Sequence, residues 1–485
     1  MAYNGLNGDA PVSGKPRSPR SWRLTVASCG LILAPAIQAA DALIANVALP
    51  KIEADLGSGV ELGAWVITSY LCATAVMAPL TGMLRRRYGA RRLFPGAVGL
   101  FVIASVLCAM SPSGSALVIS RILQGIGGGV IHPLAQAILL DIYPRERHGR
   151  IMAALGAGIM LGPILGPPLG GFVTDLASWR WVFLINLPLG LFAIACVWQL
   201  RGATEPSHES AIEPVAVGAL VLGVTCLQLF LQRGVEGLAQ NPIEGIAEGG
   251  LAAASFTVLI LRARRGAVAV FRPEVFRDIN FATATFYNFM LSALLFVTVV
   301  FLPALAEGPL AFPAGLAGAL IVPRAMLLMT VMLLVGPLIG KIDHRILLST
   351  GWVLMAAGLF MLASLRPSQS VIWIIIGSVV QSLGAGLLYI PLATLAFSTL
   401  IPMLRTDATG LYSLIRQLSY AAGVAIMTAL LQARTLVRIA DHTLAHVSAG
   451  ARLAAYSDCF RVMGVASLVI IPAIFLFRAA PANES

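Results

Sequence analysis

The sequence predicts an all-α membrane protein with fourteen transmembrane helices, and three observations carry this prediction. The 485 residues are 58% hydrophobic and only 11% charged, with a mean hydropathy of +0.86, whereas soluble domains carry roughly 25% charged residues. Fourteen apolar runs reach the length of about 20 residues that a helix needs to cross a bilayer. Positive charges gather on alternate loops between these runs, as they do on the cytoplasmic side of membrane proteins.

The fourteen runs follow one another along the chain. Their centres lie near residues 36, 72, 101, 127, 161, 190, 221, 253, 291, 325, 355, 382, 420 and 468. With the N-terminus inside, 22 of the 33 Lys and Arg residues fall on the inner side and 8 on the outer side, while Arg121, Arg324 and Arg416 lie within spans. This asymmetry predicts a multi-pass protein of the cytoplasmic membrane with both termini in the cytoplasm.

The composition also bears on other classes of function. A net charge of +11 can indicate nucleic-acid binding, but its place on the inner loops favours contact with anionic lipid headgroups instead. The six cysteines lie in or beside apolar runs without a CxxC pair, which predicts packing rather than metal or redox chemistry. The sequence contains no P-loop, HExxH or GxSxG motif, so we expect neither an enzyme nor a resident cofactor.

The order of the runs predicts a duplicated unit. A basic turn follows the second span at residues 81–94, and a similar turn follows the tenth at residues 336–348, as expected for repeated halves of a secondary transporter. We expect a disordered cytoplasmic tail at 1–21, a six-helix half at 22–203, two extra helices at 204–268, a second, pseudo-symmetric six-helix half at 269–479 and a short tail at 480–485.

Ionisable and polar residues inside the spans are the candidates for function. Asp41 lies in the first span and Arg121 in the fourth; burial favours the protonated form of a carboxyl group, whereas an arginine stays charged. Either residue could instead serve helix packing. Candidate substrate contacts are Asn46, Gln124, His132, Tyr287, Asn288, Arg324, Tyr389, Tyr412 and Arg416. Because arginines outnumber acids within the spans, we expect lipophilic neutral or weakly acidic substrates.

The stretch GIMLGPILGPPLGG in the fifth span combines a helical spacing with helix-breaking residues. It contains Gly158, Gly162, Gly166 and Gly170 at every fourth position, then Gly171, with Pro163 and Pro167 between them. Small residues at this spacing let two membrane helices approach closely, and prolines free backbone carbonyls and permit bending. The stretch therefore predicts a bendable, tightly packed seam.

Several motifs, in order along the chain, resemble the major facilitator superfamily and in particular its fourteen-helix drug/proton antiporters of the EmrB type. They are DALIANVALPKI from Asp41, RILQGIGGGVIHP from Arg121, the glycine stretch from Gly158, WRWVFLINLPLG from Trp179 and TDATGLYSLIRQLSYAAGVAI from Thr406. The resemblance implies halves of six helices around two extra ones and proton-coupled efflux of small lipophilic or amphipathic compounds by alternating access. It gives Asp41 and Arg121 the proton-coupling role and makes the proton gradient the energy source.

The resemblance has further implications for loops and partners. It makes Gly82, Arg87, Gly89 and Arg91 part of a loop motif. The arginines of this turn could anchor the inner side of the membrane or form a latch whose ion pairs break when the inner gate opens; they are Arg85, Arg86, Arg87, Arg91 and Arg92. It implies that the glycine stretch faces the tenth span, and it allows a periplasmic adaptor and an outer-membrane channel as partners. The leucine and alanine spacing in residues 434–458 predicts an amphipathic helix on the outer surface.

Two other functions stay open at this point. One is a dedicated metabolite or siderophore exporter of the same fold. The other is a transport-inactive sensor or scaffold, against which Asp41, Arg121 and the fifth-span motif argue together.

Overall fold

The computed structural model describes residues 21–57, 60–198, 213–264, 273–312, 319–366, 371–440 and 447–477. In these ranges every regular element is a helix, apart from an isolated bridge between Ile339 and Ile342. Fourteen helical segments are long and apolar enough to cross a membrane. The predicted number of spans and the all-α membrane fold class are therefore confirmed.

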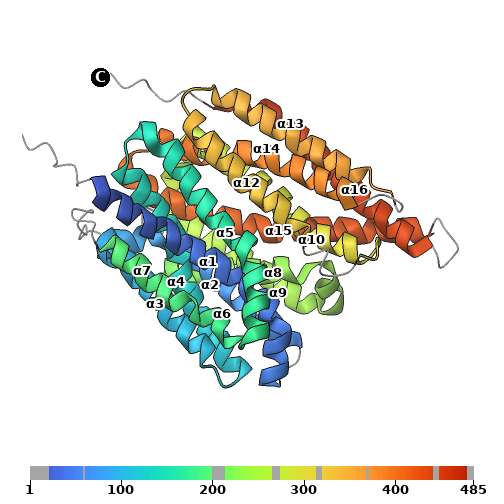
Figure 1. Cartoon of the computed structure of the whole chain (residues 1–485), viewed down its shortest axis with the longest axis horizontal. Coiled ribbons are helices and arrows are strands. Elements are labelled where there is room, and N and C mark those ends of the chain that lie inside the picture. Colours follow the sequence, from blue (N-terminus) through green and yellow to red (C-terminus); the bar gives the residue numbers. More distant parts are fainter. Residues whose placement is uncertain are drawn as a thin grey trace, which may run out of the picture.

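The helices fall into the three groups expected from the sequence (Figure 1). The first group is α1 (Ser21–Leu56), α2 (Val60–Tyr88), α3 (Ala90–Ala109), α4 (Gly114–Ile142), η1 (Arg145–Arg147), α5 (His148–Leu176), α6 (Arg180–Leu184) and α7 (Asn186–Val197). The extra pair is α8 (Pro214–Gln240) and α9 (Pro242–Arg264). The last group is η2 (Pro273–Arg277), α10 (Ile279–Glu307), α12 (Ile321–Val335), η3 (Gly336–Leu338), α13 (His344–Ala363), α14 (Val371–Ser398), η4 (Pro402–Leu404), α15 (Arg405–Ala440), α16 (Val447–Val469) and η5 (Ile471–Leu476).

The two six-helix halves repeat one packing scheme. Helix α4 packs on α2 and α3 in the first half, and α14 packs on α12 and α13 in the second. A close approach of backbones recurs at equivalent places: a Cβ added at Gly127 would lie 2.7 Å from the Phe101 nitrogen, and one at Gly384 would lie 2.5 Å from the Gly351 oxygen. Gly127 and Gly384 are 257 residues apart, as are Gln124 and Gln381. The predicted boundaries of the extra pair lie outside the described residues and stay a prediction.

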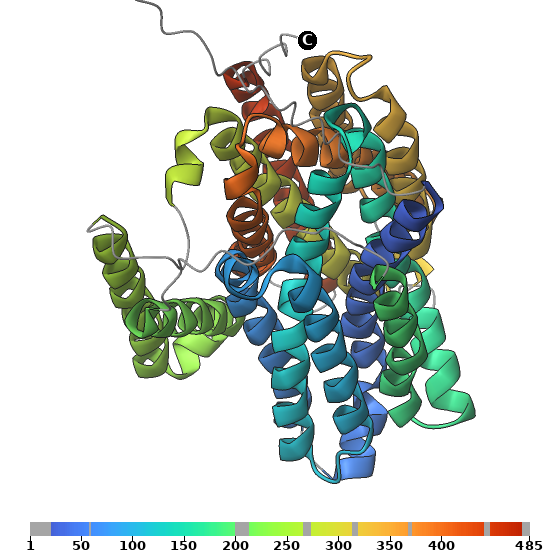
Figure 2. The same ribbon diagram turned by 90° about the vertical axis from the view of Figure 1, so that its left-hand side faces the viewer.

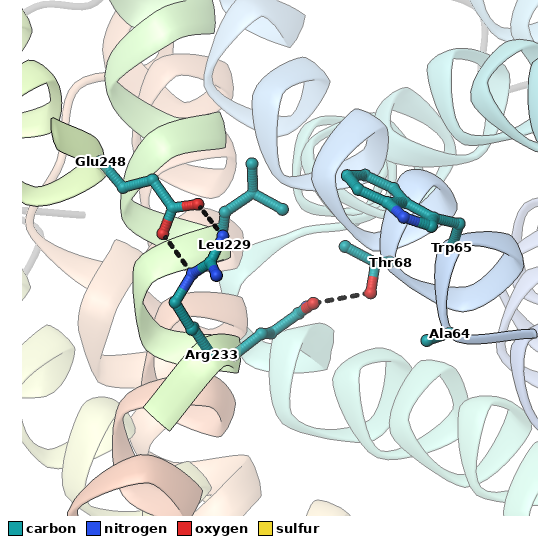
Figure 3. Close-up of a pocket in the computed structure, with 7 residues that line it drawn as sticks. Ala64, Trp65, Thr68, Leu229, Arg233 and Glu248 are labelled. Atoms are coloured by element: carbon teal, nitrogen blue, oxygen red, sulfur yellow. Dashed lines mark hydrogen bonds and ion pairs between the residues drawn. The ribbon is translucent and has the colours of Figure 1, made fainter. Parts of the chain in front are cut away.

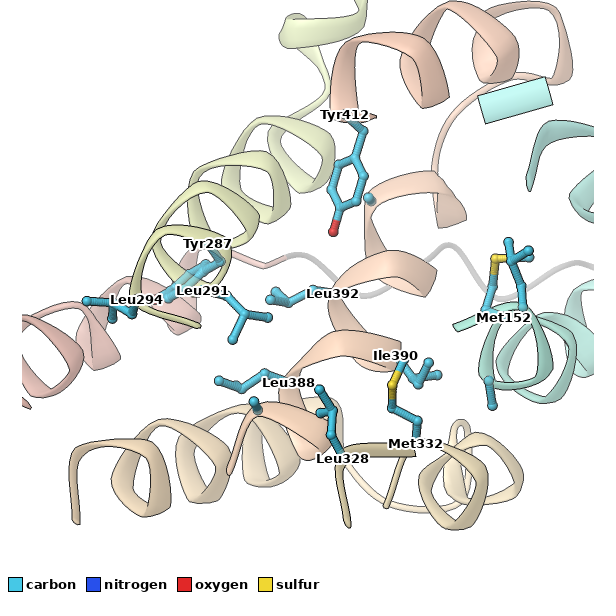
Figure 4. Packing of buried hydrophobic residues seen from close by; sticks show 14 of the residues in the cluster. Met152, Tyr287, Leu291, Leu294, Leu328, Met332, Leu388, Ile390, Leu392 and Tyr412 are labelled. Carbon is cyan, nitrogen blue, oxygen red and sulfur yellow. The ribbon is translucent and has the colours of Figure 1, made fainter. Parts of the chain in front are cut away.

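The halves meet at the end of the bundle that the charge asymmetry predicts to be cytoplasmic. Helix α5 contacts α12 and η3 there, and a Cβ at Gly149 would lie 2.7 Å from the oxygen of Gly336, the first residue of η3. Met152 of α5 belongs to the same apolar cluster as Met332 and Ile390 of the second half, and Figure 4 shows these side chains. On the opposite side of the bundle α2 contacts α15. We call the end of the bundle at which the two halves meet, and which the charge asymmetry predicts to be cytoplasmic, the closed end.

The glycine stretch of α5 packs against α1, so the expectation that it faces the tenth span, α12, is wrong. A Cβ at Gly162 would lie 2.8 and 2.9 Å from the backbone of Ala39 and Ala40, and Gly158 and Gly170 similarly meet Ile32 and Ile44. Gly166 is looser, at 3.3 Å from Leu43, and Gly171 has nothing within 4 Å. The contact with α12 is made by residues of α5 that precede the stretch, since a Cβ at Gly156 would run into Met332. Pro163 and Pro167 lie within α5 between these glycines.

The extra pair lies beside the junction of the halves rather than apart from it (Figure 2). Helix α8 contacts both α2 and α15. An apolar cluster unites Leu80 of α2, Leu220 and Val224 of α8, Leu259 of α9 and Leu414 of α15. The pair therefore covers one of the two seams between the halves.

The prediction of a separate surface helix at 434–458 is wrong for those residues of the range that the structure describes. Helix α15 continues to Ala440, and α16 begins at Val447. The helical spacing that suggested a separate element thus belongs to extensions of two spanning helices.

Candidate functional site

Asp41 and Arg121 form an ion pair in the interior of the first half. The side chain of Asp41 is 0% exposed and that of Arg121 is 1% exposed, and Arg121 Nη1 donates to Asp41 Oδ2 at 2.7 Å. The two residues come from α1 and α4 and are 80 positions apart in the chain. Among the described buried side chains of this half, Asp41 is the one acid. The structure thus brings together the two residues to which the resemblance gave proton coupling.

Two amides complete the surroundings of the Asp41 carboxylate. Gln124 Nε2 donates to Asp41 Oδ1 at 2.9 Å, and Asn186 Nδ2 donates to the same oxygen at 2.6 Å. Both amides also donate to Ser105 Oγ, at 2.7 and 3.2 Å. Gln124 Oε1 in turn accepts from Arg121 at 2.6 Å. Every neighbour of the carboxylate is a donor, so the arrangement fits an ionised Asp41, and a proton on it would have no acceptor.

The guanidinium of Arg121 has partners besides the acid. Its Nε donates to the Val66 carbonyl at 3.3 Å, and its Cζ lies 4.1 Å from the centre of the Tyr70 ring and 5.7 Å from that of Phe183. A cation against an aromatic face is stabilised by the ring quadrupole. Arg121 can therefore stay satisfied in part when Asp41 loses its charge. We call Asp41, Ser105, Arg121, Gln124 and Asn186 the Asp41 cluster.

Sequence reasoning missed two members of the Asp41 cluster, Asn186 and Ser105. Asn186 is a lone amide in the apolar run FLINLPLG, at the first residue of α7. Such a residue in a span is a signal for a buried hydrogen bond. Ser105 carries a weaker signal, because serine in a membrane helix can also bond its own backbone, as Ser105 does with the Phe101 carbonyl at 2.9 Å.

The glycine stretch contributes to the Asp41 cluster indirectly. Gly162 meets the backbone of Ala39 and Ala40, which directly precede Asp41. The close contact between α5 and α1 therefore fixes the turn that carries the acid. This links the fifth-span motif to Asp41 inside one half of the molecule.

A second polar group lies where α4 faces α15. Arg416 Nη1 donates to the Tyr389 hydroxyl at 3.0 Å, and Arg416 is half-buried. His132 is buried on α4, and Arg416 is its electrostatic neighbour from the other half. Thr74 of α2 donates to Gln417 at 3.3 Å. Among the described residues no acid pairs with Arg416, so the interface of the halves carries a positive charge.

Arg324 is the other arginine that the sequence places within a span of the second half. Its side chain is 4% exposed, and Nη1 has no hydrogen-bond partner among the described residues. It therefore does not reach outward to the membrane surface. It is a buried cation for which the described part of the chain supplies no anion.

The other candidate contacts are placed differently. Tyr287 is fully buried, donates to the Ile470 carbonyl and stacks on Phe477, so it belongs to the core of the second half (Figure 4) and not to a substrate cavity. Asn288 donates to the Tyr412 carbonyl at 3.3 Å, which ties α10 to α15. The polar atoms that suggested binding here satisfy neighbouring backbone. Asn46 is exposed on α1.

The basic turn after α2 contributes to the closed end through two of the five arginines predicted for the latch, Arg85 and Arg86. Arg86 of α2 pairs with Asp407 in the first turn of α15, whose side chain is fully buried. Gly82 makes room for this contact, because a Cβ there would run into Asp407. Gly89 has a φ of 72° before α3, which is the sharp turn expected of a glycine.

Asp141 joins both halves at the same end. It accepts from Arg85 of its own half at 2.7 Å and from Arg405 of the other half at 3.3 Å. Arg85 also donates to Thr406 at 2.6 Å.

Arg87 and Arg91 do not take part in these ion pairs. Both are exposed, and neither makes an ion pair with a described residue. Of the five arginines predicted for the latch, Arg85 and Arg86 thus make ion pairs at this end, whereas Arg87 and Arg91 lie on the surface.

A bundle of two repeated six-helix halves, with a buried ion pair in one of them, defines a secondary transporter of the membrane. The family model of the Major Facilitator Superfamily matches residues 31–424. The chain belongs to this superfamily, which consists of transporters and not of enzymes, and it is a multi-pass membrane protein.

Curated relatives cover most of the chain. The multidrug export protein EmrB of Haemophilus influenzae is 33% identical over 412 residues, which make up 84% of this chain and 80% of the relative. EmrB of Escherichia coli K12 is 30% identical over 408 residues, with the same shares. The fatty acid resistance protein FarB of Neisseria gonorrhoeae is 30% identical over 423 residues, or 84% of this chain and 82% of the relative.

Solved structures share the fold. The human organic anion transporter MFSD10 aligns with a TM-score of 0.61 at 18% identity, over 95% of this chain and all of that one. The proton:xylose symporter XylE aligns with a TM-score of 0.62 at 16% identity, over 94% of this chain and 96% of that one. At these identities the likeness concerns the fold alone.

Proposed function

We propose that the chain exports small lipophilic or amphipathic compounds across the cytoplasmic membrane in exchange for protons, by alternating access. The Asp41 cluster is the observation that carries this proposal. An acid without exposure to water, held by an arginine and two amides, is the kind of intramembrane group that relays protons. The relatives named as multidrug export proteins support export and a broad substrate range.

Protonation of Asp41 changes the forces between α1 and α4. The neutral carboxyl no longer attracts Arg121, and its new hydrogen faces only donors. Arg121 keeps its contacts with Gln124, the Val66 carbonyl and the Tyr70 ring. The free energy needed to separate Arg121 from Asp41 is therefore lower than it would be if Asp41 were the sole partner of Arg121. Proton uptake from one side of the membrane and release on the other is thereby linked to a change in the packing of α1.

The ion pairs at the closed end support alternating access. Opening this end requires the separation of Arg86 from Asp407 and of Arg405 from Asp141, since each pair joins α2 or α4 to α15. The positive-inside asymmetry supports a cytoplasmic place for this end. The state described here is then closed to the cytoplasm.

The buried arginines favour lipophilic neutral or weakly acidic substrates over dications. Arg324 and Arg416 have no acidic partner among the described residues, so a dication at the interface of the halves would meet repulsion. The energy source proposed is the proton gradient, without a cofactor. A periplasmic adaptor and an outer-membrane channel are proposed as partners by resemblance to the EmrB type.

Reconstituted protein tests the proposal. In proteoliposomes with an internal pH-sensitive dye, addition of a medium-chain fatty acid analogue is expected to move protons with the wild-type chain and not with Asp41→Asn. Asp55→Asn is a matched control, because Asp55 lies on the same helix but is exposed and paired with Arg180 at 2.7 Å. Proton-coupled export at the wild-type rate by Asp41→Asn would overturn the assignment of Asp41.

A charge exchange tests the gate separately. Arg86→Asp or Asp407→Arg alone is expected to weaken the closed end and slow export, and the double exchange is expected to restore part of the rate. If the double variant is no faster than either single variant, the ion pair does not hold the gate.

A further inference from the structure

A pocket outside the Asp41 cluster lies between α2 and the extra pair α8–α9 (Figure 3). It has a volume of about 260 Å³. Its lining includes Trp65 and Thr68 from α2, Leu229, Gln232 and Arg233 from α8, and Glu248 from α9. No step of the proposed transport cycle uses these residues.

The polar groups of the pocket have partners but also free bonding capacity. Thr68 donates to Gln232 Oε1 at 2.7 Å, and Arg233 donates from Nε and Nη2 to Glu248 at 3.2 and 2.8 Å (Figure 3). Glu244 also pairs with Arg233 Nη2 at 2.8 Å. The amide nitrogen of Gln232 and Nη1 of Arg233 make no bond with a described residue. Two carboxylates thus face one guanidinium, beside two unused donors.

The ends of the apolar spans put the pocket at the depth expected for lipid headgroups. Arg233 is the next-to-last residue of the apolar span Pro214–Gly234, and Ala64 is the second residue of the span Gly63–Tyr88. Trp65 is 51% exposed, as is usual for tryptophans at the boundary between hydrocarbon and water. Leu229 lies one turn deeper, so the pocket is apolar towards the membrane and polar towards its surface.

A break in α8 shapes the polar side. Gly234 has φ 60° and ψ −166° and interrupts the helix directly after Arg233. A residue with a side chain rarely adopts this conformation. A Cβ at Gly234 would have nothing within 4 Å, so the requirement for glycine concerns the backbone and not the space. The break ends the straight part of α8 where Arg233 meets Glu244 and Glu248 of α9.

We propose that this pocket binds the headgroup of a zwitterionic phospholipid. The phosphate accepts from the Gln232 amide and from Arg233 Nη1, and the ammonium group lies against Glu244, Glu248 and the face of Trp65. An acyl chain then follows Leu229 into the membrane. An anionic lipid without an ammonium group leaves the second carboxylate uncompensated and faces repulsion. Such a lipid joins the extra pair to α2 and is independent of the proposed transport.

Lipid retention by the full chain tests this proposal. The protein is purified in mild detergent, exposed to equal amounts of phosphatidylethanolamine, phosphatidylcholine and phosphatidylglycerol, and examined by native mass spectrometry. We expect phosphatidylethanolamine to be retained about tenfold more than phosphatidylglycerol, in line with the gain from an ammonium group between carboxylates and an aromatic ring. Equal retention of the ethanolamine and glycerol lipids would overturn the proposal.

Variants place the effect at the pocket. Glu248→Gln and Trp65→Leu are each expected to remove most of the preference; Trp65 makes no ion pair, so its replacement leaves the Arg233 contacts intact if Glu248→Gln impairs folding. Glu307→Gln is the matched control, because Glu307 is an exposed acid at the end of α10 and away from the pocket. An unchanged preference in Trp65→Leu would show that lipid binds elsewhere.

Phosphatidylcholine distinguishes the contribution of the Trp65 ring from that of hydrogen bonds to the carboxylates. Retention equal to that of phosphatidylethanolamine assigns the preference to the Trp65 face, and weaker retention assigns it to hydrogen bonds with the carboxylates. Both results support the pocket.

Discussion

The Asp41 cluster has a counterpart in the second half, and the two differ in one respect. Asp41 and Thr298 are 257 residues apart, as are Gln124 and Gln381. In each half the glutamine of the fourth helix donates its amide nitrogen to the first helix at 2.9 Å, to Asp41 in one case and to Thr298 in the other. Arg121 corresponds to Ser378. The first half thus holds a charged pair where the second holds neutral groups.

This difference indicates how a duplicated fold can divide its tasks. The glycine contacts and the glutamine bond are kept in both halves, since they fix helix packing. At these equivalent positions the charged pair occurs in the first half alone, so the proposed proton exchange would belong to one side of the pseudo-symmetry axis. In the second half Gln381 Oε1 has no partner among the described residues, so polar bonding there is less complete.

The largest contrast is expected between removal of Asp41 and removal of Thr298. Asp41→Ala leaves Arg121 buried without its anion, which typically costs about 3–5 kcal/mol of unfolding free energy. Thr298→Ala removes one neutral bond and is expected to cost about 1 kcal/mol. Denaturant unfolding of the purified variants in detergent measures both, and equal losses would contradict the division between the halves.

A double variant separates stability from function. Asp41→Leu combined with Arg121→Met replaces the buried pair by apolar groups, which is often neutral or stabilising. We expect stability to return while proton-coupled export stays absent.

The second test concerns what the halves share. Gly127→Ala and Gly384→Ala each place a Cβ within 2.7 Å of backbone, so both are expected to lose about 1–3 kcal/mol of stability through overpacking. Gly171→Ala is the control, since nothing lies within 4 Å of its added Cβ. Thermal unfolding followed by tryptophan fluorescence gives the comparison, and a loss confined to one half would disprove the shared scaffold.

The third test uses the equivalent glutamines. Gln124→Leu removes bonds to the ionised Asp41 and Arg121, which are worth about 1.5–3 kcal/mol each. Gln381→Leu removes one hydrogen bond to Thr298 and also the unpaired Oε1. We therefore expect the free energy of unfolding to change by no more than about 1 kcal/mol. The same unfolding measurement applies. A greater loss in Gln381→Leu than in Gln124→Leu would reverse the assignment of the charged half.

The smallest effect is expected at Asp55, the second paired acid of α1. Hydrogen bonds from Trp179 and Arg180 lower the pKa of Asp55 below its usual range. Its contribution to stability is therefore present above the pKa of the unfolded chain and is lost only as the pH falls through the lower folded value. In assays between roughly pH 5 and 8, the Asp55→Asn variant should therefore show the same pH profile of export as the wild-type chain. A shifted profile would show that Asp41 is not the sole acid on α1 that affects coupling.

The sequence was sufficient for the fold and for the centre of the site. Fourteen apolar runs and the charge asymmetry carry the architecture because lipid imposes length and composition on every span. Asp41 and Arg121 could be named as candidates in advance because an ionisable residue inside a span usually serves function, but their pairing comes from the structure. Asn186 and Ser105 could not, since a single polar residue in a span does not indicate which helix it faces.

The errors concern partners rather than elements. The glycine stretch identified a close approach correctly, but spacing does not name the other helix, and α1 takes the place expected for α12. In the loop motif the face of the last turn of α2 decides which arginines reach α15, and Arg85 and Arg86 lie on that face. Tyr287 resembled a binding residue because a tyrosine hydroxyl inside a span can donate either to a ligand or to a neighbouring backbone carbonyl. The packing of the helices decides which of the two it reaches, and the sequence does not show that packing.

The contact of α8 with both α2 and α15 makes a symmetric architecture one-sided. Two repeated halves present two equal junctions to the bilayer, and the α8–α9 pair covers the one between α2 and α15. Within the described part of the chain, a compound dissolved in the lipid meets the junction of the halves directly along α5 and α12. A substrate that enters sideways from the bilayer would therefore enter from the side of α5 and α12. A neighbouring membrane protein that lies against this side would block that entry, and one that lies elsewhere would not.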